Sequence, residues 1–204
     1  MDSGINYSSL FNLVLNNRSY RRFDNTFSVS KEILRELVGL ARLTSSSKNR
    51  QPLKYILVTE EDECAFVFHR LKWAWHLRDS DGPSPDERPA AYLIMLLDKK
   101  LNERADFDAG ISAQTILLGA VEKKLGGCII RTCNRYELGK FFKLPEELEI
   151  IMVIALGKPA EHVVLDDEDP TGKMEYYRDD QNVHHVPKRT VDELIYEPTR
   201  NDQD

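Results

Sequence analysis

The longest uncharged stretch of the chain predicts its central element. Residues 109–121 contain no charged side chain, and Asp108 and Glu122 bracket them. The polar residues in between are too few to make a solvent face, and a helix that is apolar all round is a buried helix. The stretch is well short of the roughly 20 residues that a bilayer demands, so we expect a core helix and not a membrane span. The rest of the protein is expected to wrap it.

A buried strand is predicted directly after this helix. Gly126 and Gly127 would supply the left-handed or permissive backbone that ends a helix. Residues 128–130 are a short apolar run, which suits a covered strand. The stretch 108–130 is therefore expected to form one helix followed at once by one strand.

The pattern also predicts shorter elements on both sides of this stretch. Residues 8–15 are expected to form a short helix with Leu10, Leu13 and Val14 facing inward. Ser30 has the properties of an N-cap, and an apolar stripe follows it up to Ala41. The remaining predicted elements are strands at 53–59, 90–97 and 149–156 and helices at 61–77 and 135–142.

Two segments lack such periodicity. Residues 79–89 hold three prolines and several acidic residues, which is typical of a loop, and we consider them a candidate lid. From about residue 160 to 204 the chain is acidic and polar, so we expect an arm that lies on a partner subunit. Taken together, the elements indicate a single domain, residues 1–204, of the α+β class.

Composition narrows the function classes. The chain has 204 residues, is 41% hydrophobic and carries a formal charge of −6, so it can bury a core but lacks the excess of basic residues that nucleic-acid binding needs. Three cysteines without a pairing pattern fit reduced thiols. The N-terminus lacks the pattern of a signal peptide. We therefore expect a cytoplasmic protein that binds neither nucleic acid nor membrane.

A cluster of hydrogen-bond donors near the N-terminus suggests an anion site. Arg18, Ser19 and Arg21 offer guanidinium groups and a hydroxyl within four residues, which suits a phosphate monoester. From spacing alone, a solvated basic turn is the favoured interpretation. Residues 45–51 could bond the edge of a polar ring or only their own backbone. Lys188 and Arg189 are a basic pair in an acidic arm, or simply a surface pair.

Other conspicuous residues have simpler explanations. His162, His184 and His185 lack the spacing of a metal site, so we expect no metal and a solvated histidine pair. Cys128 is expected to be a small buried hydrophobe. For the tryptophans at 73 and 75 core packing or subunit contact is the favoured role, although together with His76 they could line a pocket.

Six segments, in this order, resemble the FMN-dependent nitroreductase family over nearly the whole chain. They are residues 18–23, 47–52, 108–114, 125–130, 155–159 and 187–189. The resemblance implies a nitroreductase-like α+β fold, in which helices flank a central mixed or antiparallel sheet around the long buried helix. It also implies a homodimer that exchanges its C-terminal arms and binds two FMN molecules at the subunit interface.

The resemblance assigns cofactor contacts to two groups in the first quarter of the chain. Arg18, Ser19 and Arg21 would contact the phosphate and the ribityl chain. Asn49 and Gln51 would touch the flavin ring and the ribityl chain.

Further cofactor contacts are implied in the second half of the chain. The backbone of Ile130, Arg131 and Thr132 would lie beside the reactive nitrogen of the ring. Lys188 and Arg189 would close on the phosphate. Two positions depart from the family pattern, because the family often has arginine at position 17 and tryptophan at position 53, where this chain has Asn and Leu.

The implied reaction is cofactor chemistry that needs no catalytic side chain of the protein. NADH or NADPH would pass a hydride through FMN to a small electrophilic acceptor such as a nitroaromatic or a quinone. Arg50 or Arg131 could stabilise charge at the pyrimidine edge of the flavin, or could be surface residues. Two rivals remain open: a flavoenzyme of the same fold with other chemistry, such as dehalogenation or flavin fragmentation, and a flavin-binding dimer without turnover.

Overall fold

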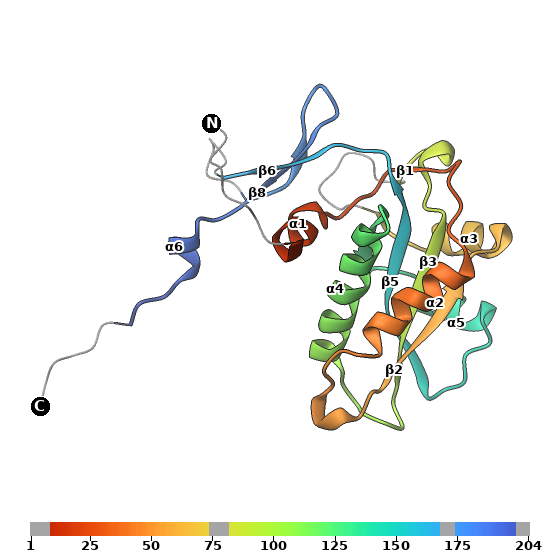
Figure 1. Ribbon diagram of the computed structural model, residues 1–204. Helices are drawn as coiled ribbons and strands as arrows, with labels where there is room; N and C mark the ends of the chain where they lie inside the picture. The colour runs from red at the N-terminus through yellow and green to blue at the C-terminus, as the bar shows by residue number, and fades with distance from the viewer. Residues whose placement is uncertain (1–8, 74–81, 168–173, 199–204) are drawn as a thin grey trace, which may run out of the picture. The chain divides into compact units, whose positions relative to one another are not determined.

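The computed structural model describes residues 9–73, 82–167 and 174–198 (Figure 1). The chain divides into two compact units, and the boundary between them falls after Ala160. The larger unit holds the sheet and the helices that precede this boundary, and the smaller one holds most of the remaining residues.

An antiparallel sheet forms the centre of the larger unit. β5 pairs with β3 and β3 with β2, while β4 and β1 also pair with β5, and each of these pairings is antiparallel. The expected α+β class is confirmed, and of the two expected sheet types this sheet is the antiparallel one. The strands are β1 (Phe23–Asp24), β2 (Leu53–Val58), β3 (Ala91–Asp98), β4 (Gly126–Ile130) and β5 (Leu148–Pro159).

Helices cover both faces of this sheet (Figure 1). Side chains of α2 and α4 pack on one face, and side chains of α3 and α5 pack on the other. All eight residues of β3 are buried, which explains the run of apolar and aromatic residues from Ala91 to Leu97. The helices are α1 (Ser9–Asn16), α2 (Lys31–Ala41), α3 (Glu61–Phe68), α4 (Asp106–Glu122) and α5 (Arg135–Phe141), with short 3-10 helices at η1 (Ser47–Asn49) and η2 (Pro85–Glu87).

The expectation that α4 is wrapped on every side is wrong for this protomer. Ala113, Ile116 and Ala120 are fully buried, but Phe107 is 87% exposed and Ile111 is also exposed. The layer of α2 and the sheet covers only one side of a helix, so the apolar residues on the other side remain uncovered. No helix of the described residues is long and apolar enough to cross a membrane.

The short helix α1 also leaves its apolar side chains uncovered. Leu10 is 60% exposed and Val14 is exposed as well, whereas Leu13 is half-buried. The predicted inward orientation is therefore wrong for Leu10 and Val14 within the protomer. Exposed apolar surface of this kind is typical of interaction sites.

The glycines after α4 serve a different purpose from the predicted one. The left-handed residue is Lys124, with φ 59°, and Gly126 and Gly127 are the first residues of β4. A Cβ atom on Gly126 would lie 2.3 Å from the ring of Tyr20, and one on Gly127 would lie 2.5 Å from the carbonyl oxygen of Ala155. Glycine is required here because other chain segments approach the strand closely.

Two element boundaries differ from the prediction. α3 ends at Phe68 rather than near residue 77, while Trp73 is buried in the core as expected. Trp75 and His76 lie outside the described residues. β5 continues through Pro159, because Pro159 pairs with Phe23 of β1.

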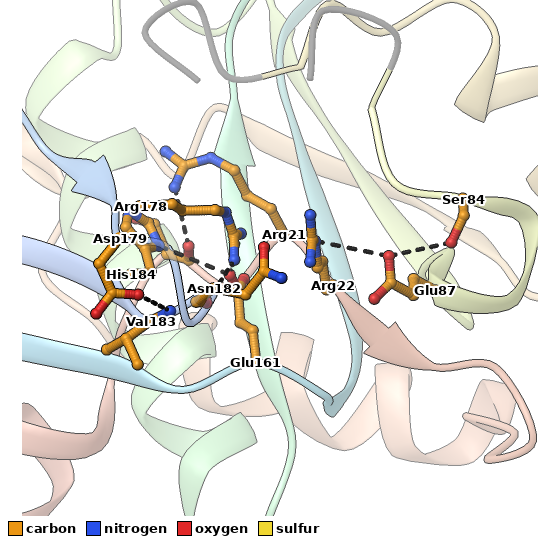
Figure 2. Close-up of polar contacts among 11 residues, drawn as sticks. Arg21, Arg22, Ser84, Glu87, Glu161, Arg178, Asp179, Asn182, Val183 and His184 are labelled. Atoms are coloured by element: carbon orange, nitrogen blue, oxygen red, sulfur yellow. Dashed lines mark hydrogen bonds and ion pairs between the residues drawn. The ribbon is translucent and has the colours of Figure 1, made fainter. Parts of the chain in front are cut away.

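The loop predicted at residues 79–89 is described from residue 82 onward. It contains η2, and Asn25 donates a hydrogen bond to the carbonyl oxygen of Pro85 (3.1 Å). Arg22 forms an ion pair with Glu87 (3.6 Å), which also accepts a hydrogen bond from Ser84 (Figure 2). The described part is thus fastened to the segment around β1. The role of a lid stays a prediction.

The smaller unit contains a second sheet rather than an arm without strands. β6 (Val163–Asp166) pairs parallel with β8 (His184–Pro187), and β7 (Tyr177–Arg178) pairs antiparallel with β8. The short helix α6 (Val191–Leu194) follows and begins with a capping box at Thr190. Along β8, His184 and Pro187 are buried, while His185 and Val186 between them are half-buried.

The solvated histidine pair is a wrong prediction. His184 is only 1% exposed, and its Nδ1 lies 3.7 Å from a carboxylate oxygen of the buried Glu161. His185 lies between two carboxylates, at 3.0 Å from Asp166 and 3.3 Å from Asp179. The sequence did not reveal these contacts, because the pairing of β6 and β7 with β8 brings the carboxylates next to the histidines.

Candidate functional site

The segment that carries Arg18 and Ser19 lies beside the first residues of β4. Ser19 forms a parallel bridge with Gly127, and the backbone N–H of Tyr20 donates to the carbonyl oxygen of Gly127 (3.0 Å). This places two of the predicted phosphate ligands next to the strand that ends at Ile130. The structure therefore brings together residues that are more than 100 positions apart in the sequence.

The Arg18 side chain makes one local hydrogen bond and keeps one nitrogen without a partner among the described residues. One of its terminal nitrogens donates to the carbonyl oxygen of Val14 (2.6 Å), while its Nε is buried and has no hydrogen-bond partner among the described residues. Burial lowers the pKa of the Arg18 guanidinium, although the nearby Tyr20 raises it slightly. A half-buried cation whose buried Nε–H is unused fits a phosphate oxygen. The terminal nitrogen of Arg21 also donates locally, to the carbonyl oxygen of Ser19 (3.2 Å).

The predicted contacts after β4 lie along one continuous segment. Ile130 is buried in the sheet, and Arg131 and Thr132 are exposed directly after it. The carbonyl oxygen of Thr132 accepts a hydrogen bond from the backbone of Lys72 (2.9 Å), and that of Arg131 accepts one from Arg135 (3.0 Å). These bonds fix the backbone path beyond the strand.

Asn49 and Gln51 lie in a loop with an unusual backbone. Lys48, Asn49 and Gln51 have φ angles of 51°, 53° and 48°. Residues other than glycine rarely adopt this left-handed conformation. The side chain of Gln51 donates to Oδ1 of Asn49 (3.0 Å), so the two predicted flavin contacts are bonded to each other. Arg50 points elsewhere and donates to Asn102 (3.3 Å).

A buried carboxylate at the start of α4 holds this loop. Asp108 is 4% exposed and accepts hydrogen bonds from the hydroxyl of Ser46 (2.5 Å) and from the backbone N–H of Ser47 (3.2 Å). The Ser46 hydroxyl in turn accepts from the backbone N–H of Gln51 (2.9 Å). The predicted set of site residues omits Asp108 and Ser46. An acidic residue in the first turn of a helix with a long uncharged stretch was the available signal.

A cavity of about 620 Å³ lies beside the same loop, between α2 and β2. Gln51 and Asp108 line it, together with Arg35 and Arg42 from α2. β2 pairs only with β3 among the described strands, so its outer edge faces this cavity with unpaired backbone groups. The sequence pattern did not predict the cavity.

The remaining predicted ligands belong to the smaller unit. Lys188 directly follows β8, and its backbone N–H donates to the carbonyl oxygen of Asp166 (2.8 Å). Arg189 is exposed and lies 3.8 Å from Glu193. Arg178 contacts Glu161 in the same unit (Figure 2). These contacts fasten the backbone that carries the basic pair.

Within one protomer the two groups of the larger unit are far apart. Ser19 is level with Gly127 and Leu156, whereas Pro52 is level with Asp98 and Leu148 at the opposite end of the sheet. A strand rises about 3.3 Å per residue, and neighbouring strands lie about 4.8 Å apart. The segment that carries Arg18 and Ser19 and the loop that carries Asn49 and Gln51 are therefore roughly 30 Å apart. One mononucleotide cannot touch both groups in a single copy of the chain.

Solved structures of other proteins have a similar arrangement of helices and strands. Solved structures with the same fold include a nitroreductase family protein from Clostridium difficile 630, with 21% identity, a TM-score of 0.60 and coverage of 77% of this chain and 86% of that one. An FMN-dependent nitroreductase from Clostridium difficile R20291 has 23% identity, a TM-score of 0.60 and coverage of 74% and 88%. A nitroreductase from Exiguobacterium sibiricum 255-15, solved in complex with FMN, has 16% identity and a TM-score of 0.63. The match covers 76% of this chain and 90% of that one.

Similarity to individual sequences is weaker than similarity to the family. No curated protein matches the chain. The Nitroreductase family matches residues 14–158, which include the Arg18 segment, the loop at 46–51, α4 and the main sheet except for Pro159 at the end of β5. Because the match spans most of the chain, we conclude that this protein belongs to the nitroreductase family.

Proposed function

We propose that this protein is an FMN-dependent oxidoreductase that passes a hydride from NADH or NADPH to a small electrophilic acceptor, such as a nitroaromatic or a quinone. The observation that carries this proposal is the Arg18 guanidinium, which is partly buried and keeps an N–H group unused. The family membership and the structural neighbours described as FMN-dependent or FMN-bound support it.

The residues of the chain would hold the cofactor, which supplies the redox chemistry when bound. Arg18, Ser19 and Arg21 would bind its phosphate with charge-assisted hydrogen bonds. The segment from Ile130 to Thr132 would line one side of the ring, since its backbone path is fixed by Lys72. Exclusion of water by such a wall favours transfer to a bound acceptor over side reactions.

We further propose that the functional unit is a homodimer in which each site takes the Arg18 group from one subunit and the loop carrying Asn49 and Gln51 from the other. The separation of these groups in one protomer supports this arrangement. In a two-fold symmetric dimer every contact occurs twice, so two equivalent composite sites would form. Lys188 and Arg189 would join the phosphate from the smaller unit.

Exposed apolar surface supports the dimer. Phe107 and Ile111 on α4 and Leu10 and Val14 on α1 form uncovered faces that a second copy could bury. Burial of such side chains contributes about 25 cal/mol for each Å² removed from water.

The exposed segment after α6 and the edge of β2, which is unpaired among the described strands, support the expected exchange of C-terminal arms. After α6 the chain exposes Ile195 and Tyr196, and acidic residues Asp192 and Glu193 precede them. The cavity beside β2 offers an unpaired strand edge and two arginines. We propose that this segment of one subunit pairs with the β2 edge of the other, a recognition mode known as strand addition.

Anaerobic reduction of the bound flavin tests the proposed function. Purified protein reconstituted with FMN should be yellow and should bleach on addition of NADH or NADPH, and an acceptor such as a quinone should restore the colour. Protein that stays colourless after reconstitution would refute the binding of FMN. Protein that is yellow but never bleaches with either nicotinamide would refute the oxidoreductase activity.

A further inference from the structure

The loop at residues 46–51 must be held in place by contacts outside itself. Its residues Lys48, Asn49 and Gln51 adopt left-handed backbone conformations that cost free energy for side chains with a Cβ atom. A free loop of this composition would relax to other conformations. Backbone strain of this kind persists only where the surroundings determine it.

Asp108 supplies this constraint at both ends of the loop. It accepts hydrogen bonds from the Ser46 hydroxyl and from the backbone N–H of Ser47, and Ser46 relays the contact to the backbone N–H of Gln51. The loop is thus closed on itself through one hydroxyl and one carboxylate. The carboxylate belongs to the first turn of α4, where the helix dipole favours negative charge.

The closed loop orients two amide side chains relative to each other. The bond from Gln51 to Asn49 uses Oδ1 of Asn49 and one hydrogen of Gln51. Gln51 Nε2 also donates to the carbonyl oxygen of Asn49 (3.4 Å), so that Nδ2 of Asn49 and Oε1 of Gln51 stay without a hydrogen bond among the described residues. Such a pair can match the alternating donors and acceptors of a flavin pyrimidine edge, or the hydroxyls of a ribityl chain.

We propose that Asp108 is a positioning residue, which sets the conformation of the loop at 46–51 and thereby presents Asn49 and Gln51 to the flavin of the composite site. The proposal rests on the proposed function for the identity of the ligand. The clamp itself is a property of the chain alone. Asp108 acts through Ser46 and does not need to touch the cofactor.

The test compares variants of Asp108, Asp106 and Ser46 in the full-length protein. Asp108→Asn keeps the shape of the side chain and removes its charge, whereas Ser46→Ala removes the relay and leaves the carboxylate. Asp106→Asn is the matched control, because Asp106 is an exposed acidic residue in the same first turn of α4. It changes the charge at the helix start equally and leaves the loop contacts intact.

Hydrogen–deuterium exchange of the peptide covering residues 44–53 measures the clamp in protein without FMN. We expect exchange at least tenfold faster in Asp108→Asn and Ser46→Ala, and unchanged exchange in Asp106→Asn. Flavin fluorescence quenching measures the consequence, and we expect FMN binding about 10- to 50-fold weaker in the first two variants only. Exchange in peptides of β3 and β5 should stay as in the wild type, which separates a local clamp from general unfolding.

Three outcomes decide between the interpretations. Unchanged exchange at 44–53 in both loop variants would overturn the clamp. Faster exchange with unchanged FMN affinity would show that Asp108 holds the loop for a structural reason alone, which overturns its role in positioning. A wild-type chain that binds no FMN would refute the proposed function and the flavin contact together, while the exchange measurement would still decide the clamp.

Discussion

The composite site makes a prediction that mixing of two defective variants can test. One variant carries Arg18→Ala and Arg21→Ala, and the other carries Asn49→Ala and Gln51→Ala. Each homodimer then has two damaged sites. In a mixed dimer one site receives both defects, and the other receives the intact arginines from one subunit and the intact loop from its partner.

The expected effects follow from the contacts at each group. Hydrogen bonds to a charged group contribute about 1.5–3 kcal/mol each, so loss of both arginines should weaken FMN binding roughly 10²- to 10⁴-fold. Neutral hydrogen bonds contribute about 0.5–1.5 kcal/mol each, so loss of both amides should weaken it roughly 5- to 150-fold. At an FMN concentration near the wild-type dissociation constant, the arginine variant would be nearly empty, and the amide variant would hold at most about one third of the wild-type flavin.

Random mixing should make about half of the dimers mixed, with one intact site each, so roughly one quarter of the wild-type sites should return. The assay is flavin content after co-expression, followed by NADH-dependent bleaching. Mixed dimers isolated with two different tags should hold about half of the wild-type flavin. If every site were built from one subunit, no mixture would regain flavin, and that result would refute the composite site.

Two further predictions concern stability. Gly127→Ala should lower the free energy of unfolding by about 1–3 kcal/mol, because the new Cβ meets the Ala155 carbonyl oxygen, while Gly39→Ala should not destabilise; equal denaturation midpoints would contradict this. Burial opposes protonation of His185, but Asp166 and Asp179 together raise its pKa. The contribution of the charged His185 to the stability of the smaller unit is therefore fully present below about pH 6.5. It is lost as the pH rises through the pKa of His185 in the folded protein. An NMR titration showing a His185 pKa below that of a free histidine would disprove it.

Much of the fold could be predicted from local patterns. Ser30 caps α2 as expected, and the apolar stripe after it packs on the sheet. The three predicted strands at 53–59, 90–97 and 149–156 correspond to β2, β3 and β5. Such predictions succeed because side-chain periodicity reports directly which face of an element is covered.

Other predictions failed where a distant segment decides the outcome. A pair of glycines such as Gly126 and Gly127 is typical of the end of a helix. Glycine is needed at these positions, however, because Tyr20 and Ala155 approach the backbone closely. The uncharged stretch of α4 indicated complete burial, although Phe107 and Ile111 on one side of the helix are exposed. A sequence pattern shows that a side chain is apolar, but it does not show which molecule covers it.

The sequence by itself determined the order of the elements, the candidate ligands and the family resemblance, because each of these depends on residues near one another in the chain. The tertiary structure alone decided that Asp108 clamps a loop some 60 residues away and that Arg18 and Asn49 lie at opposite ends of one protomer. The physical reason is that hydrogen bonds and charge contacts act over a few ångströms in space, and the path of the whole backbone sets which residues come that close.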